Sequence, residues 1–260
     1  MNLKQIHWEK KKQLSLIEFQ VPLNNTKAVL FDKDGTLCLS GSYLTALAIA
    51  RADFCKRLSG INNLQAPLLA AYGISEKGID PAGATAVASR QNNLISTATV
   101  LAIHGVDWCQ AQQWAETALA QADAALADRK AKLTPPTPGL VAMLQRLQNR
   151  GITMAILSSD IGSSLEDFLL EHQLMHFFKA IYGADRNPAK PDPAAAISVC
   201  EILAVKPGAC GMVGDAEADL SMAAAAGLGW SLAYQGGWDL PLQLSGSHGH
   251  LQHWDQFAPL

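Results

Sequence analysis

The chain reads Val29-Leu30-Phe31-Asp32-Lys33-Asp34-Gly35-Thr36-Leu37 near its amino terminus. The apolar run that ends at Phe31 is typical of a strand covered on both faces. Open α/β sheets bind their ligands at the carboxyl ends of such strands, and two aspartates follow here directly. Because side chains alternate along an extended chain, we expect Asp32 and Asp34 to point one way and Lys33 the other. Gly35 then allows a sharp turn.

Two other interpretations of this stretch need to be weighed. A calcium loop of the EF-hand type requires Gly at its sixth position and Glu at its twelfth. Counting from Asp32, those positions hold Leu37 and Tyr43, so the calcium loop is excluded. An ordinary turn remains open for an isolated motif, because Asp and Gly are common turn residues. Further motifs elsewhere in the chain are needed to distinguish an ordinary turn from a functional site.

Composition limits the possible classes of protein. The chain has 260 residues, of which 49% are hydrophobic and 17% charged, as expected for a folded globule with one large domain or a domain plus a smaller one. The net charge of -3 gives no reason to expect a nucleic-acid partner. Five cysteines without a CxxC pair suggest neither a zinc site nor a disulfide framework. No apolar run approaches the roughly 18 residues of a membrane helix, so we expect a cytoplasmic protein that does not bind membranes.

The segment from 42 to 135 has helical patterns and no strand pattern, which predicts an all-helical unit inserted between the first and second strands of a sheet. We therefore expect three parts: an N-terminal extension (1–26), an α/β core (27–41 and 136–260) and the inserted helical unit (42–135).

Beyond Leu140 the chain alternates between helix and strand. Apolar strands are predicted at Ile152–Leu157, near Ala180–Tyr182, at Cys210–Val213 and at Trp230–Ala233. Together with the first strand, they predict a doubly wound, Rossmann-like α/β fold with five parallel strands.

Polar residues follow several of these strands. Ser158 comes directly after the second strand, Lys190 lies in a later loop, and Asp215 and Asp219 stand four residues apart at a helix start. In a parallel sheet these positions share one edge. Each residue alone has an ordinary explanation as a helix cap or a solvated side chain, but their common location favours a site.

The order of these motifs resembles that of the haloacid-dehalogenase superfamily of phosphohydrolases, which includes phosphoglycolate phosphatases. The four family motifs correspond to Asp32–Thr36 (DxDGT), Ile156–Ser158, Lys190–Pro191 and Gly214–Asp219 (GDxxxD). The resemblance covers Lys27 to about Tyr234, with the helical unit in the position of the family's cap domain. Two departures are Lys33, where an apolar residue is common, and Ser159, where Asn is frequent.

The resemblance implies a role for each motif residue. Asp32 would be the nucleophile that forms an aspartyl phosphate, and Asp34 would act as general acid and base. Ser158 and Lys190 would bind the phosphoryl group. Contacts with the substrate are also expected from Gly35, Thr36 and Ser159.

A magnesium ion is expected at the same place. Two carboxylates about 4 Å apart repel by roughly 4 kcal/mol at an effective dielectric constant of 20. Lys190 alone cannot offset them and a substrate dianion as well. The implied Mg²⁺ ligands are the Asp32 carboxylate, the Asp34 backbone carbonyl and Asp215, with Asp219 accepting a hydrogen bond behind them or binding through water.

These features predict a Mg²⁺-dependent phosphatase for a small phosphorylated metabolite, such as phosphoglycolate, that acts as a monomer or small homo-oligomer. Arg90, which ends a glycine-containing loop from Ile74, is the candidate contact for a carboxylate or second phosphate of the substrate, and a surface arginine on a helix of the inserted unit is the alternative. A phosphomutase would use the same aspartates, and a non-catalytic phosphate-sensing module is a further alternative. A dehalogenase is disfavoured because its reaction has no leaving alkoxide for Asp34 to protonate.

Overall fold

A central parallel sheet organises the computed structural model, which describes residues 25–242, 244, 245 and 247–257. Most of the predicted N-terminal extension lies outside these residues. The sheet has six strands in the order β5-β4-β1-β6-β7-β8. Their bounds are β1 Ala28–Phe31, β4 Thr153–Leu157, β5 Phe178–Tyr182, β6 Cys210–Gly214, β7 Trp230–Tyr234 and β8 His250–Leu251.

The predicted α/β fold and its five strands are confirmed, and β8 is an additional strand. It has only two residues and pairs with β7 through Ala233 and His250. A segment this short, between glycine and glutamine, has no apolar run that would mark it as a strand.

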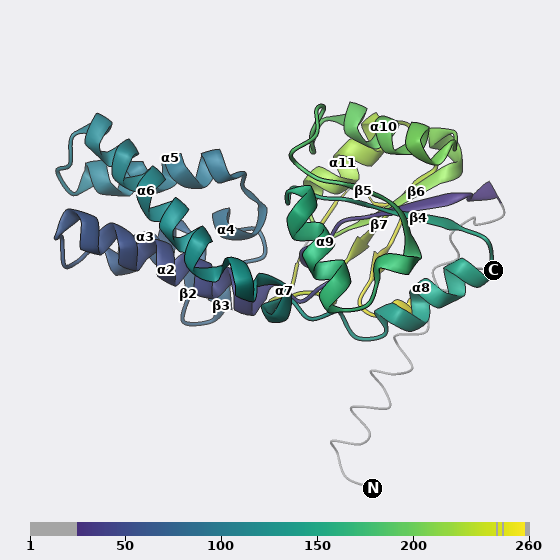
Figure 1. The fold of residues 1–260 in the computed structure, drawn as a ribbon, viewed down its shortest axis with the longest axis horizontal. Coiled ribbons are helices and arrows are strands. Elements are labelled where there is room, and N and C mark those ends of the chain that lie inside the picture. Colours follow the sequence, from purple (N-terminus) through teal and green to yellow (C-terminus); the bar gives the residue numbers. More distant parts are fainter. Residues whose placement is uncertain (1–24, 243, 246, 258–260) are drawn as a thin grey trace, which may run out of the picture.

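Helices cover both faces of the sheet (Figure 1). Val29 and Phe31 of β1 pack toward α8 (Leu140–Asn149) and α9 (Gly162–Glu171). Ala28 and Leu30 pack toward α10 (Pro193–Leu203) and α11 (Glu217–Ala225). Because β1 is buried on both faces, it is apolar at every position. Short 3₁₀ turns complete this part of the chain: η3 Met175–Phe177, η4 Pro207–Ala209 and η5 Trp254–Gln256.

Residues 41–133, which we call the cap, form a separate body beside the sheet (Figure 1). The cap has its own apolar cluster. Its helices are α2 Gly41–Ser59, α3 Gln65–Ala71, α4 Ala84–Val87, α5 Arg90–Ile103, α6 Trp108–Leu126, η2 Ala127–Arg129 and α7 Lys130–Leu133. The expected all-helical unit also contains an antiparallel hairpin of β2 (Ile74–Ser75) and β3 (Gly78–Ile79). Gly78, at φ +110°, permits the tight turn of this hairpin.

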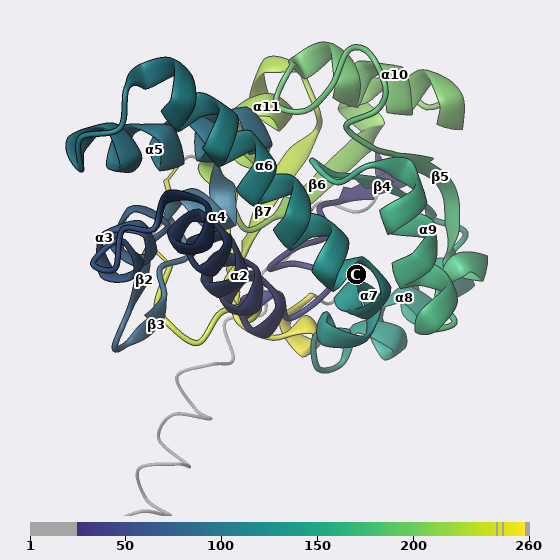
Figure 2. The ribbon, with the colours of Figure 1, turned by 60° about the vertical axis from the view of Figure 1, so that its left-hand side comes forward.

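Two linkers join the cap to the core. They are hydrogen-bonded to each other, since the Leu39 N–H donates to the Pro135 carbonyl at 2.9 Å. In Figure 2, α6 leads back toward the core and α7 lies beside α9. None of the helices in the described ranges is long and apolar enough to cross a membrane.

Trp254 ties the carboxyl-terminal segment to the core. Its side chain is fully buried and stacks on Tyr234, with ring centroids 4.1 Å apart. Its indole N–H donates to the Thr137 hydroxyl at 2.8 Å. Through these contacts, Trp254 in the segment after Tyr234 packs against the core.

We expect Trp254→Ala to lower the free energy of unfolding by about 3–5 kcal/mol, because it leaves a large cavity and removes one hydrogen bond to the Thr137 hydroxyl. Urea denaturation monitored by circular dichroism measures this loss. Trp108→Ala is the matched control, since Trp108 is 45% exposed and its removal should cost far less. Equal losses for the two variants would show that Trp254 does not anchor the segment.

Candidate active site

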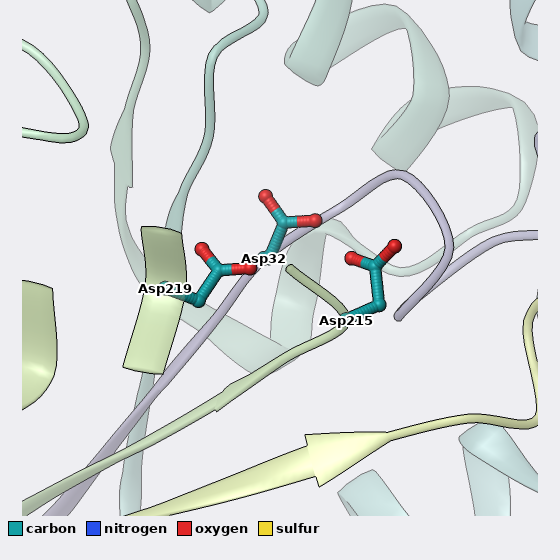
Figure 3. Close-up of side chains that lie close together, drawn as sticks. All are labelled: Asp32, Asp215 and Asp219. Carbon is teal, nitrogen blue, oxygen red and sulfur yellow. The ribbon is translucent and has the colours of Figure 1, made fainter. Parts of the chain in front are cut away.

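Three buried aspartates meet at the carboxyl edge of the sheet. Each of Asp32, Asp215 and Asp219 offers a carboxylate oxygen, and these oxygens all lie within 4.8 Å of one another. Figure 3 shows the three side chains pointing into one space. They meet because β1 and β6 are neighbours in the sheet, so that Asp32 and Asp215 end adjacent strands, while Asp219 lies in the first turn of α11.

Lys190 joins two of these carboxylates. Its ammonium nitrogen lies 2.5 Å from Asp32 Oδ1 and 2.5 Å from Asp219 Oδ1. The other oxygen of Asp219 accepts the backbone N–H of Ala216 at 3.1 Å. Since both Asp219 oxygens have protein partners, this residue is suited to holding Lys190 against Asp32.

Asp215 is held by two neutral donors. The Thr36 hydroxyl donates to its Oδ1 at 3.2 Å, and the Trp238 indole N–H donates to its Oδ2 at 2.7 Å. Gly35 adopts φ +74°, and a Cβ at this position would collide with both Asp215 and Trp238. The loop therefore requires glycine for its conformation and for this close approach. The sequence patterns did not identify Trp238 as a site residue, because it follows two glycines and belongs to no motif.

The cluster has too little positive charge. Burial raises the pKa of Asp32 to about 6, because the opposing effect of the Lys190 charge is smaller than the effect of burial. The pKa of Asp215 lies well above its ordinary value, because of burial and the nearby charges of Asp32 and Asp219. The site offers only oxygen ligands to a cation, which Mg²⁺ prefers. The residues present thus fit a divalent metal ion.

Asp34 stands apart from this cluster. Its Oδ1 accepts hydrogen bonds from Ser40 Oγ at 2.5 Å and from Lys33 Nζ at 2.8 Å. The expectation that Lys33 points away from both aspartates is wrong. The chain turns immediately after Asp32, because the Lys33 carbonyl accepts the N–H groups of Leu37 and Cys38. The alternation of an extended strand therefore ends before Asp34.

The buried Lys33 belongs to a chain of ion pairs that reaches the cap. Its ammonium also lies 3.0 Å from Asp160 Oδ2, and Asp160 Oδ1 lies 2.5 Å from the ammonium of Lys130 in α7. Although burial alone would raise the pKa of Asp34, Lys33 and Lys130 hold it below its usual range. Asp160 directly follows Ser158 and Ser159, and this polar run after a strand was the signal that could have identified it.

Ser158 is buried at the end of β4, the other neighbour of β1. Its hydroxyl oxygen accepts the backbone N–H of Asp160 at 3.2 Å, which leaves the hydroxyl proton free to point elsewhere. Ser159 is exposed and faces a cavity of about 450 Å³ between the cap and the sheet edge.

Arg90 lines the same cavity from the cap. Its guanidinium pairs with Glu116 at 3.0 Å and with Asp123 at 3.2 Å, and the side chain is 44% exposed. Asp34 and Asp160 line the cavity from the core. The structure thus places Arg90 and Asp34 around one space, with Arg90 engaged by cap carboxylates.

Comparison with known proteins identifies relatives of this chain. A family profile described as haloacid dehalogenase-like hydrolase matches residues 26–227. Phosphoglycolate phosphatase 1 of Pseudomonas aeruginosa is 30% identical over 205 residues, which cover 78% of this chain and 67% of the relative. The phosphoglycolate phosphatase of Pseudomonas putida is 31% identical over 205 residues, with the same coverage.

Solved structures share the fold at lower identity. A predicted phosphoglycolate phosphatase from Haemophilus somnus superimposes with a TM-score of 0.68 at 19% identity, covering 90% of this chain and 96% of that one. A putative β-phosphoglucomutase from Thermotoga maritima has a TM-score of 0.55 at 15% identity, covering 87% and 94%. These likenesses concern the fold.

We expect Asp32→Asn to stabilise the metal-free protein at pH 8. A raised pKa means that the folded state binds the proton more tightly, so stability falls as pH rises from about 4 through about 6. Asparagine does not ionise and avoids this loss, which is roughly 3 kcal/mol for such a shift.

Thermal unfolding in chelator at pH 4 and pH 8 measures the effect. The melting temperature should rise at pH 8 and change little at pH 4. Asp128→Asn, at an exposed aspartate, is the control. A gain of equal size at both pH values would show that the ionisation of Asp32 does not destabilise the fold.

Proposed function

Since the chain belongs to the haloacid dehalogenase-like hydrolases, we propose that it is a Mg²⁺-dependent phosphatase of small phosphorylated metabolites that acts through an aspartyl phosphate. The observation that carries this proposal is Asp32, paired with Lys190 and adjacent to Asp215 at the ends of neighbouring strands. The names of the relatives make phosphoglycolate the first substrate to test.

The groups around Asp32 are suited to a phosphoryl group. Lys190 supplies a buried positive charge beside the nucleophile. The Ser158 hydroxyl has its proton available for a phosphate oxygen. With Gly35, Thr36 and Ser159 in the surrounding loops, these residues would hold the phosphorus in line with the Asp32 carboxylate.

A bound Mg²⁺, held by the carboxylates of Asp32 and Asp215 and the backbone carbonyl of Asp34, would offset the charge of the phosphate. Thr36 and Trp238 leave lone pairs on the Asp215 oxygens for such an ion. Asp219 is proposed to support Lys190 or to bind the ion through water.

Two proton transfers are assigned to Asp34. As an Asp32 oxygen bonds to phosphorus, the bond from phosphorus to the organic oxygen breaks, and Asp34 gives that oxygen its proton. Asp34 then takes a proton from the water that cleaves the aspartyl phosphate. Lys33 favours the ionised form of Asp34, so its protonated form is rare at neutral pH. We therefore expect leaving-group protonation to limit esters of poor leaving groups.

Asp32→Asn should abolish phosphate release, because an amide is a poor nucleophile. Asp34→Asn should lower kcat more for an alkyl ester such as phosphoglycolate than for p-nitrophenyl phosphate, whose leaving group needs no proton. Released phosphate is measured for both esters. Near-normal turnover by Asp32→Asn, or equal losses on both esters with Asp34→Asn, would contradict these assignments.

Activity should disappear in chelator and return with Mg²⁺, and Asp215→Ala should raise the Mg²⁺ concentration needed for half-maximal activity by 10-fold or more. Trp238→Phe should raise it less, since only a donor to Asp215 is lost. Trp230→Phe is the matched control, because its indole N–H donates to Thr26 instead. Full activity in excess chelator would rule out the metal.

A further inference from the structure

Trp238 connects the aspartate cluster to the cap. Its indole N–H donates to Asp215 Oδ2 at 2.7 Å, and its partly buried ring packs against a second apolar cluster of the cap. The buried members of this cluster, which we call the cap-base cluster, are Tyr43, Leu44, Leu47, Ile79, Ala122 and Leu126. Within the described ranges, Trp238 is the only residue in or against this cluster that lies outside residues 41–133. One side chain of the core therefore touches both a proposed metal ligand and the apolar interior of the cap.

The backbone around Trp238 is fixed on the core. A Cβ at Gly237 would collide with the backbone of Gly35, so these two glycines bring the segment against the loop after β1. Farther along, Ser245 donates to the Glu217 carboxylate through its N–H at 3.0 Å and its hydroxyl at 3.1 Å. Glu217 is the first residue of α11. The segment is thus attached, on both sides of Trp238, to the two parts of the chain that form the aspartate cluster.

The cap-base cluster lies where the cap joins the core. Ile79 packs against the start of α2, since a Cβ built on Gly41 would lie 3.7 Å from its side chain. Gly41 directly follows Ser40, whose hydroxyl donates to Asp34. Because the backbone of Trp238 is fixed and its indole is rigid, the direction of the indole N–H depends on how the cap base packs against the ring.

The orientation of Asp215 depends on this N–H. The Thr36 hydroxyl lies 3.2 Å from Asp215 Oδ1, beyond the roughly 3.0 Å that is usual for a hydrogen bond between two oxygens. The Trp238 contact with Oδ2, at 2.7 Å, is the shorter and stronger of the two. A carboxylate that is held in place before it binds an ion loses less conformational freedom on binding. The stronger donor therefore has the larger effect on the affinity of Asp215 for a metal ion.

We propose that Trp238 is a positioning residue that couples metal binding at Asp215 to the position of the cap. When the cap-base cluster packs on the indole ring, the N–H is directed at Asp215 and holds the carboxylate for the ion. When the cap base moves away, the ring loses this support and the hydrogen bond weakens. Because such coupling is reciprocal, the cap position described here is in turn favoured by metal binding. This inference rests on the metal assignment of the proposed function.

Binding of Mn²⁺ to the full chain tests the coupling without reference to activity. Mn²⁺ takes the same octahedral oxygen sites as Mg²⁺, and the electron paramagnetic resonance signal of the free ion gives its dissociation constant. Trp238→Phe keeps an aromatic ring but lacks the N–H, so it should raise this constant about 5-fold. Trp230→Phe, which removes an indole N–H bonded to Thr26, should leave it within 2-fold.

A change in the cap base should act on the metal site only through Trp238. Ile79→Ala should raise the Mn²⁺ dissociation constant about 3-fold in the wild-type background. It should have no further effect in Trp238→Phe, where no N–H remains to be directed. Leu94→Ala is the matched control and should leave the constant unchanged. It removes the same number of carbon atoms from a cap residue of similar burial, 7% exposed against 8% for Ile79, in the other apolar cluster of the cap.

Thermal melts verify that each variant folds. Should Ile79→Ala not fold, the smaller truncation Ile79→Val replaces it, with a smaller rise that again disappears in Trp238→Phe. If the wild-type protein binds no Mn²⁺, the metal assignment is wrong and this inference fails with it. If Mn²⁺ binds, the metal assignment stands, and the coupling is overturned by any of three results: Trp238→Phe binds as tightly as the wild type, Ile79→Ala has no effect, or Ile79→Ala weakens binding equally in both backgrounds.

Discussion

Three buried carboxylates with one lysine beside them impose the main constraint on this structure. Asp32, Asp215 and Asp219 are buried within reach of one another, and Lys190 contacts only two of them. Burial opposes the ionisation of Asp32 and Asp215 and raises the pKa of both groups. Such an arrangement is typical of a site whose charge is completed by a ligand, and it accounts for the close approach of glycine, threonine and tryptophan around Asp215.

A second set of charges connects this site to the cap. Lys33 bridges Asp34 and Asp160, and Lys130 on α7 contacts Asp160 from the other side. Lys33, one of the two departures from the family pattern, thus links the loop after β1 to the cap through Asp160. Any movement of α7 away from the core changes the charge beside Asp34. Cap position and the proton affinity of Asp34 are therefore coupled in this chain.

The features that the sequence predicted are those set by contiguous residues. The apolar run before Asp32 and the similar run before Ser158 specify buried strands, and parallel pairing places their ends together. The contacts that could not be predicted depend on how distant segments meet. Trp238 reaches Asp215 from an irregular segment, and the cluster that its ring packs against comes from separate elements of the cap. The predicted direction of the Lys33 side chain was wrong because a turn begins at Lys33, so the alternation of an extended strand does not continue to Asp34.

The insertion of the cap between β1 and β4 also affects the order in which the chain can assemble. β1 lies at the centre of the sheet, and its two partners are β4 and β6, which are synthesised after the entire cap. The cap forms its apolar cluster from residues close in sequence. In contrast, β1 can pair with β6 only after β6 has been synthesised. The apolar strand that precedes Asp32 is consequently translated before the cap but covered on both edges only after β6 is made, so it needs protection from aggregation during that interval.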